Sequence, residues 1–178
     1  MPQPKTPFRI GVMQLTMEPL DEILEHARVL DQGGFDTIWL AEAYPWWRKH
    51  SMEARSSTAL SPLVARETER LAIGWGIVSP FTRHPIQIAM EARVTQEAAG
   101  EGRFYLGLGV SKIFMRHAGI GSKPVGAMKE AAEIIRGVLA GGPVGSMGQR
   151  VLQPIVNQQV QHVLSALDAQ VQAAKPGA

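Results

Sequence analysis

Side chains that can bind an anion or move a proton gather in three short stretches of this chain. Residues 42–50 combine a carboxylate with aromatic and cationic side chains. Residues 79–84 end in Arg83 and His84, and residues 109–112 end in a serine and a lysine. Aromatic faces beside cations suit a planar ligand that carries negative charge or phosphate. We therefore expect a small-molecule site wherever the fold brings these stretches together.

Each stretch follows a run of apolar residues that is typical of a buried strand. Four such runs alternate with segments whose apolar residues recur at helical spacing. The expected strands are residues 8–15, 35–42, 70–79 and 103–111, and the expected helices are residues 18–34, 56–68, 85–99 and 124–140. Between the second strand and the second helix, residues 43–56 are expected to form a long loop.

Four strand–helix units in a row predict an α/β fold with a parallel sheet. A doubly wound open sheet and part of a (β/α) barrel both fit this pattern. A Rossmann turn would need a G-x-G-x-x-G sequence after the first strand, which lacks it. The nearest candidate, residues 107–112, follows the fourth strand and has Lys112 in place of the third glycine. We therefore expect a partial TIM-type (β/α) barrel, with its chemistry at the carboxyl ends of the strands.

Composition excludes several classes of protein. The chain has 178 residues, of which 45% are hydrophobic, and this suits one globular core. A formal net charge of only +2 makes nucleic acid an unexpected partner. The absence of cysteine rules out disulfides, thiol catalysis and thiolate metal sites, and the histidines lack metal-ligand spacing. With no signal-peptide or membrane-span pattern, we expect a cytoplasmic protein that acts on a small molecule.

Four sequence motifs resemble one known family. They are FDTIWLAEAY followed by WW, IGWGIVSPFTRHP, GEGRFYLGLGVS and KPVGAMKEAAEIIRGVLAGG, in this order within residues 8–142. Together they resemble the luciferase-like monooxygenase superfamily, and within it the branch that depends on coenzyme F420. The resemblance implies a (β/α)8 barrel that binds F420, or alternatively FMN, at its carboxyl rim. It also implies an oxidoreductase that transfers hydride between this ring and a small organic substrate.

The resemblance also suggests which residues meet the cofactor. Several family members carry a bulge with a non-proline cis peptide in the third strand, and the motif places it at Gly76-Ile77. Glycines there would let the backbone bulge and let a flat ring approach it. The expected cofactor-binding residues are Trp46, Trp47, Gly76, Ile77, Ser79, Arg83, Gly107, Gly109 and Ser111. Close packing at the strand end is the alternative role for Gly107 and Gly109, and filling a hydrophobic gap is the alternative for the tryptophans.

The candidates for catalysis are Glu42, Tyr44, His84 and Lys112. Ala43 stands where many family members have a histidine, and Lys112 stands where sugar-phosphate dehydrogenases of the family have a glutamate. The chemistry is therefore expected to rest on hydride transfer, with protein groups mainly positioning the reactants. A structural salt bridge is the alternative for Glu42, and capping of the third helix is the alternative for His84.

Length sets this chain apart from a whole barrel, which takes about 250 residues. We expect a partial barrel over residues 1–142 and a divergent tail over residues 143–178, with one amphipathic helix starting near Pro154. An open half-barrel leaves two sheet edges and one core face uncovered. Pairing of two copies would rebuild an eight-stranded rim, so a homodimer is expected. The alternative function is a truncated, non-catalytic flavin-binding or accessory protein that acts through dimerisation.

Overall fold

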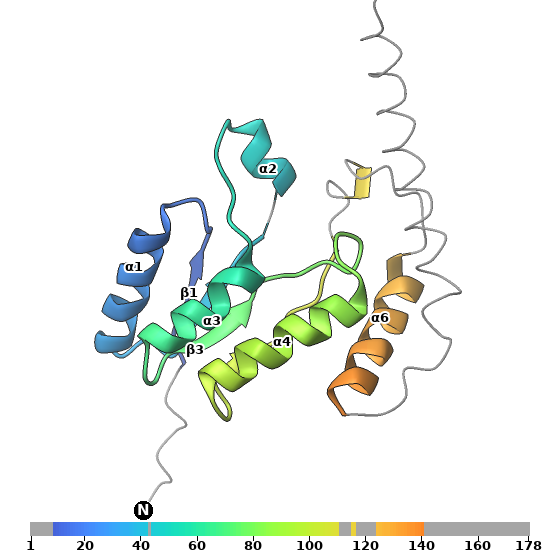
Figure 1. The fold of residues 1–178 in the computed structure, drawn as a ribbon. Helices are drawn as coiled ribbons and strands as arrows, with labels where there is room; N and C mark the ends of the chain where they lie inside the picture. The colour runs from blue at the N-terminus through green and yellow to red at the C-terminus, as the bar shows by residue number, and fades with distance from the viewer. Residues whose placement is uncertain (1–8, 43, 111–114, 117–123, 141–178) are drawn as a thin grey trace, which may run out of the picture.

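The structure, a computed structural model, describes residues 9–42, 44–110, 115–116 and 124–140. Strands and helices alternate along the chain as the sequence predicts (Figure 1). In chain order they are β1 (Gly11–Gln14), α1 (Leu20–Gln32), β2 (Thr37–Leu40), α2 (Tyr44–Lys49), α3 (Ser57–Glu67), β3 (Ala72–Trp75), α4 (Pro85–Ala99), β4 (Phe104–Tyr105) and α6 (Pro124–Leu139). The expected helix near Pro154 lies outside the described residues.

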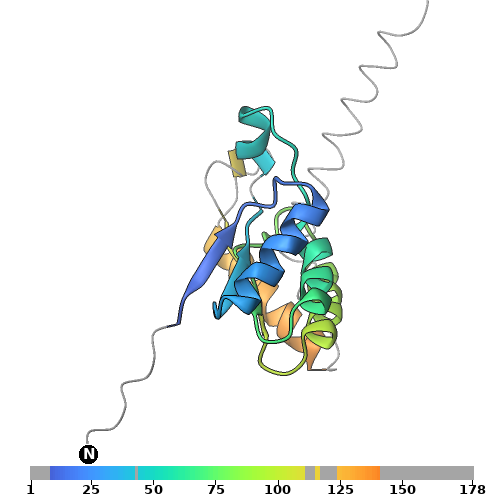
Figure 2. The ribbon, with the colours of Figure 1, turned by 90° about the vertical axis from the view of Figure 1, so that its left-hand side faces the viewer.

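The four strands form one parallel sheet in the order β1-β2-β3-β4. Each strand therefore lies beside the next one in the chain, whereas a doubly wound sheet reverses its order at a switch point. The helices lie together on one side of this sheet (Figure 2). Sequential parallel strands with helices on one side are the arrangement of a (β/α) barrel. The fold is thus a partial TIM-type barrel, and the doubly wound alternative is wrong.

Local sequence explains where the helices begin and end. Pro19 precedes α1, and Gly34 follows it with a φ of 80°, in the left-handed region that glycine adopts without cost. The hydroxyl of Ser56 accepts a hydrogen bond from the Ala59 amide and caps α3. Pro85 occupies the first position of α4, where its missing N–H is not needed. These signals set where each helix begins or ends relative to the strands that it connects.

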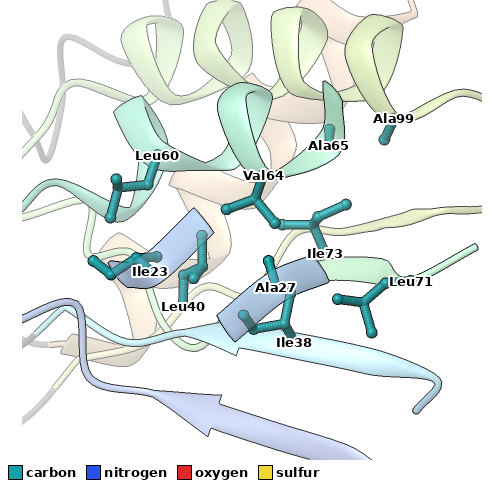
Figure 3. Packing of buried hydrophobic residues seen from close by; sticks show 10 residues of the cluster. All are labelled: Ile23, Ala27, Ile38, Leu40, Leu60, Val64, Ala65, Leu71, Ile73 and Ala99. Carbon is teal, nitrogen blue, oxygen red and sulfur yellow. The ribbon is translucent and has the colours of Figure 1, made fainter. Parts of the chain in front are cut away.

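The main core lies between the sheet and helices α1 and α3 (Figure 3). Alternate residues of β2 and β3 point into it, since side chains of a strand alternate between faces. Figure 3 labels its buried residues: Ile23, Ala27, Ile38, Leu40, Leu60, Val64, Ala65, Leu71, Ile73 and Ala99. A second cluster joins Trp75 of β3 to α4 and α6, where Ile88 and Ile135 are buried. Burial of this apolar area is the main source of the fold's stability.

The other face of the sheet is open. The described residues place no helix on it, and its side chains remain accessible although they are apolar. Met13 of β1 is 55% exposed, and Tyr105 of β4 is 36% exposed. Parallel sheets are ordinarily covered on both faces. In a closed barrel this face would line the interior. The apolar residues exposed on it therefore correspond to the interior of a complete barrel.

Two expectations about local structure need correction. The segment 43–56, expected to be a loop throughout, contains the short helix α2. Six helical residues are too few to produce a readable apolar period. The strands are also shorter than expected, and β4 has only two residues in the ladder. Its pairing with β3 stops where an extra residue enters β3, and it resumes as a single bridge between Val78 and Leu108.

Asp31, near the end of α1, fixes the chain where it turns into β3. Its carboxylate accepts hydrogen bonds from the backbone amides of Glu69 at 2.9 Å, Arg70 at 3.0 Å and Leu71 at 2.7 Å. Partial burial alone would raise the pKa of Asp31, but these three donors together hold it below its usual value. The ionised carboxylate therefore joins α1 to the segment that leads into β3.

Replacing Asp31 by asparagine is expected to lower the free energy of unfolding at pH 7 by about 1–2 kcal/mol. Because folding lowers the pKa, the wild-type advantage is present above the usual value of 3.8 and disappears as pH falls through the lowered one. Urea unfolding at several pH values measures the difference between the two proteins. Asp21→Asn, at an exposed position in the first turn of the same helix, is the matched control. A gap between Asp31→Asn and wild type that widens at low pH would contradict the prediction.

Candidate functional site

An aromatic layer crosses the open face of the sheet. Met13, Trp39, Gly74 and Tyr105 share one register position across the four strands, so they point to the same side. The Trp39 ring extends over β3 and stacks on Tyr105 of β4, with centroids 5.8 Å apart and an angle of 22° between planes. A Cβ at Gly74 would overlap the Trp39 ring. Gly74 therefore makes room for Trp39 of its own sheet, which answers why this strand carries its first glycine.

Small residues form the next layer toward the carboxyl ends of the strands. Two residues after Trp39, Gly74 and Tyr105, the chain has Ala41, Gly76 and Gly107, which strand alternation places on the same face. A Cβ at Gly76 would lie 3.4 Å from both the Met13 Cε and the Trp39 Cβ, which is ordinary contact. Packing within the described chain therefore accommodates a Cβ at Gly76 in contact with Met13 and Trp39. We call Ala41, Gly76 and Gly107 the shelf, and the Trp39–Tyr105 stack the floor beneath it.

The shelf lies where β3 bulges. Gly74 pairs with Tyr105 and Val78 bridges to Leu108, so β3 takes four steps while β4 takes three. One extra residue in one of two paired strands defines a β-bulge, and bulges concentrate beside active sites. The peptide bond Gly76-Ile77 is cis, as the motif predicted. The bulge and the cis peptide predicted from the third motif are thus confirmed at the expected residues.

The glycines of the fourth strand serve close packing. A Cβ at Gly107 would overlap the backbone carbonyl of Trp75, and a Cβ at Gly109 would lie 2.9 Å from the Ile77 Cγ1. The packing role that was the alternative for both glycines is therefore present. Because β4 approaches the bulge this closely, Gly107 also keeps the end of the shelf flat. Direct contact of Gly107 or Gly109 with a cofactor stays a prediction.

Glu42 and Arg83 meet at the rim beside the shelf. Arg83 Nη1 donates to Glu42 Oε2 at 2.6 Å, and Arg83 Nη2 donates to Glu42 Oε1 at 2.7 Å. The same Nη2 donates to the Ser56 hydroxyl at 3.0 Å, and Nε lies 3.6 Å from Glu91 Oε2. Burial alone would lower the pKa of Arg83, but Glu42 and Glu91 raise it above its usual value. This geometry is the salt bridge that was the alternative role for Glu42.

Ser79 and His84 shape the chain on either side of Arg83. The Ser79 hydroxyl accepts from the Phe81 amide at 3.3 Å, and its carbonyl accepts from both the amide and the hydroxyl of Thr82. The His84 Nδ1 accepts from the Ile86 amide at 3.3 Å and caps α4. The capping alternative for His84 is therefore present, and its imidazole is exposed to solvent. Proton transfer by His84 stays a prediction.

Trp47 is buried in the short helix α2, with 1% of its surface exposed. In the described part of the chain, no acceptor lies within hydrogen-bonding distance of its indole Nε1. A buried donor without a partner is uncommon in folded proteins. Tyr44 and Trp46 also belong to α2, but their side chains lie outside the described residues. Ser111 and Lys112 lie outside them entirely.

The structure thus brings the predicted residues into two groups: Glu42 with Arg83 at the rim, and Gly76 and Ile77 with Gly107 and Gly109 at the bulge. The sequence reasoning missed the floor and one support of the shelf. Trp39 and Tyr105 were predicted only as strand residues. The alternation of side chains along each strand was the signal that could have placed them on the same face as Gly74. Thr16, a buried residue with a φ of 51°, donates its hydroxyl to the Ala41 carbonyl at 2.9 Å. Nothing in the local sequence marks this contact.

Two classes of site find no support in the described ranges. Residues 9–42, 44–110, 115–116 and 124–140 contain no group of three or more acidic or histidine side chains that could hold a metal ion. The helices within these ranges are also too short or too polar to cross a membrane. The site is therefore built from apolar and small residues at the bulge and from the ion pair beside it.

Comparison with known proteins places this architecture in a family. The family model described as luciferase-like monooxygenase matches residues 5–165. The chain is 29% identical over 143 residues to a 5,10-methylenetetrahydromethanopterin reductase of Methanolobus tindarius, which covers 79% of this chain and 41% of that protein. This chain therefore spans about two-fifths of the length of this relative.

Solved structures show the same architecture. The coenzyme F420-dependent tetrahydromethanopterin reductase of Methanopyrus kandleri superposes with a TM-score of 0.68 at 25% identity, over 80% of this chain and 43% of that one. The oxygenating constituent of 3,6-diketocamphane monooxygenase from Pseudomonas putida, solved with FMN, gives a TM-score of 0.59 at 17% identity, over 73% of this chain and 39% of that one. The second likeness is one of fold alone.

Proposed function

Because the chain belongs to the luciferase-like monooxygenase family, we propose that it binds the flat ring of a deazaflavin or flavin on the shelf. On this proposal it is an oxidoreductase that passes hydride between the ring and a small organic substrate. The proposal concerns the barrel half that this chain contains. Its partners are expected to be the cofactor, the substrate and a second copy of the chain.

The observation that carries the proposal is the β-bulge at Gly76 and Ile77, between the pairing of Gly74 with Tyr105 and the bridge of Val78 to Leu108. Gly76 lies within this bulge, and the neighbouring positions Ala41 and Gly107 carry no large side chain. A flat apolar surface bordered by an aromatic stack fits one face of a planar ring. The residues of the shelf therefore fit the group, and the proposal assigns the unpartnered indole N–H of Trp47 as a donor for one of its oxygens.

When bound, a deazaflavin or flavin supplies the carbon or nitrogen centre that accepts or releases hydride. The residues of this chain have the complementary task of orienting the reactants and limiting water. The shelf and the floor fix the height of the ring against the sheet. The proposal favours F420 over FMN because the reductases to which this chain is similar include one that depends on coenzyme F420.

Proton transfer is assigned to groups at the rim. Both oxygens of Glu42 accept from Arg83, so this carboxylate is occupied by a salt bridge. His84 is exposed and its Nδ1 is engaged in the helix cap, which leaves Nε2 as the nitrogen for exchange with a substrate. Tyr44 and Lys112 remain proposed donors. Cytoplasmic location and dimeric assembly also stay predictions.

Titration of the purified chain with F420, and separately with FMN, tests the proposal. Cofactor fluorescence follows binding, and sedimentation of the same sample follows assembly. We expect binding in the micromolar range, about −8 kcal/mol, by a dimer whose partner covers the open face. F420 is expected to bind more tightly than FMN.

The absence of saturable binding of either cofactor by folded protein would overturn the proposed cofactor site. A monomer that binds F420 would instead overturn only the dimer. Trp47→Phe tests the hydrogen bond proposed between the Trp47 indole and the cofactor, since it keeps an aromatic side chain and removes the indole N–H. Its affinity for the cofactor is expected to fall by about tenfold, the loss of one hydrogen bond in a buried site.

A further inference from the structure

We propose that Arg83 is a positioning residue whose contacts hold the rim of the sheet in one arrangement, with Glu42 as its main partner. We call the contacts of Arg83 with Glu42, Ser56 and Glu91 the lock. The Arg83 guanidinium was expected to bind a cofactor anion. In the structure it contacts protein groups in three separate segments, and its contact with a cofactor stays a prediction. The lock itself does not depend on the cofactor, whereas its consequence for ring binding rests on the proposed function.

The contacts of Arg83 reach across the rim. The guanidinium pairs with both oxygens of Glu42, which follows β2, at 2.6 and 2.7 Å. It donates to Ser56, the residue that caps α3, at 3.0 Å, and it faces Glu91 of α4 at 3.6 Å. The side chains of Arg83 and Glu42 are 18% and 16% exposed, so water screens the pair only in part. One side chain therefore connects the segments that follow β2 and β3 with the start of α3 and the middle of α4.

The backbone around Arg83 is short and fixed at both ends. Ser79 holds a tight turn on one side through its bonds to Phe81 and Thr82. His84 and Pro85 begin α4 directly on the other side. A guanidinium held by Glu42 therefore also holds the segment that leaves the bulge. Flexible attachment would weaken this coupling, but the structure places hydrogen bonds on both sides of the residue.

The lock bears on the shelf through the backbone. Ala41 immediately precedes Glu42, and its amide donates to the Gln14 carbonyl at 2.9 Å. The Gly76 amide donates to the Leu40 carbonyl at 2.9 Å, so the two strand ends are joined directly below the ion pair. Fixing Glu42 to Arg83 therefore fixes the relative height of Ala41 and Gly76. A ring resting on both residues requires that height to be constant.

Lysine cannot reproduce this arrangement. A carboxylate and a guanidinium match as two parallel hydrogen bonds, whereas an ammonium is a single point of charge. Removing the cation altogether leaves Glu42 and Glu91 without their shared partner, and a partly buried unpaired charge is costly. We therefore expect a graded series, in which Arg83→Lys disturbs the rim less than Arg83→Gln.

Hydrogen–deuterium exchange of the full chain without cofactor tests the lock. In Arg83→Gln, amides in peptides covering residues 41–42, 55–60 and 76–82 are expected to exchange about tenfold faster than in wild type. Amides of the core strands, such as those of Ile38 and Ile73, are expected to be unchanged. Arg93→Gln is the matched control. Arg93 lies within α4, and among its described contacts it donates only to the Val138 carbonyl.

Two outcomes would overturn the lock. One is unchanged exchange in the rim peptides of Arg83→Gln, and the other is equal acceleration in the core strands, which would indicate general destabilisation. Glu42→Gln should accelerate the same peptides, and adding it to Arg83→Gln should have little further effect, since both act on one interaction. If Arg83→Gln prevents folding, Arg83→Lys carries the same comparison.

Titration separates the lock from the proposed function. If wild type binds F420, Arg83→Gln is expected to bind it about tenfold more weakly. A second outcome is that wild type binds neither F420 nor FMN while Arg83→Gln still speeds exchange in the rim peptides. This result would support the lock and overturn the cofactor proposal. Binding that is unchanged in Arg83→Gln, despite faster rim exchange, would overturn the link between the lock and the shelf.

Discussion

Gly107→Ala is expected to lower the free energy of unfolding by about 3 kcal/mol, enough to unfold much of a marginal protein. A Cβ at this position would overlap the backbone carbonyl of Trp75. Backbone cannot move aside by changing a rotamer, so β3 or β4 would have to shift. Trp75 is fully buried, and its indole donates to the Ser61 hydroxyl at 2.6 Å, which resists such a shift.

Urea unfolding measures this loss, and a second glycine supplies the control. Gly137 lies in α6, where an added Cβ meets no atom within 4 Å. Gly137→Ala is therefore expected to raise the free energy of unfolding by about 0.5–1 kcal/mol, because alanine favours the helix. Equal stability of Gly107→Ala and wild type would contradict the close approach of β4 to the bulge.

Much of the fold was accessible from the sequence because its signals are local. Alternating apolar strands and amphipathic helices predicted the four strand–helix units. The extent of β4 was not accessible in this way. Its ladder depends on whether β3 keeps step beside it, and one extra residue in β3 interrupts that pairing after Tyr105. Strand length is thus decided by the neighbour as well as by the strand itself.

The site was predictable where a motif recorded it and unpredictable where contacts joined distant residues. The third motif placed the bulge at Gly76-Ile77, where the structure has it. The pairing of Glu42 with Arg83 joins residues 41 positions apart, so no local pattern shows that the carboxylate is already occupied. Gly74 makes room for a side chain of the protein, because the register brings Trp39 of the neighbouring strand over it. Register is a property of the assembled sheet, so a single strand could not supply it.

Gly76→Ala is expected to separate binding from folding. An added Cβ would lie 3.4 Å from its nearest neighbours, Met13 Cε and Trp39 Cβ, so the packed chain can accept it. Its free energy of unfolding is therefore expected to change by less than about 1 kcal/mol. The same methyl group would stand on the shelf where the ring is proposed to lie. We expect affinity for F420 and for FMN to fall by about tenfold, which corresponds to roughly 1.4 kcal/mol.

Fluorescence titration of Gly76→Ala beside Gly126→Ala gives the comparison, since an added Cβ at Gly126 meets no atom within 4 Å. Gly76→Leu, with a larger side chain on the shelf, is expected to lose more affinity than Gly76→Ala. A folded Gly76→Ala that binds both cofactors as wild type does would mean that the ring lies elsewhere on the rim. An unfolded Gly76→Ala would mean instead that Gly76 serves packing as Gly107 does. Alanine is thus expected to reduce stability at Gly107 and cofactor affinity at Gly76. The two expectations differ because an added Cβ would overlap backbone at Gly107 but make only ordinary contacts at Gly76.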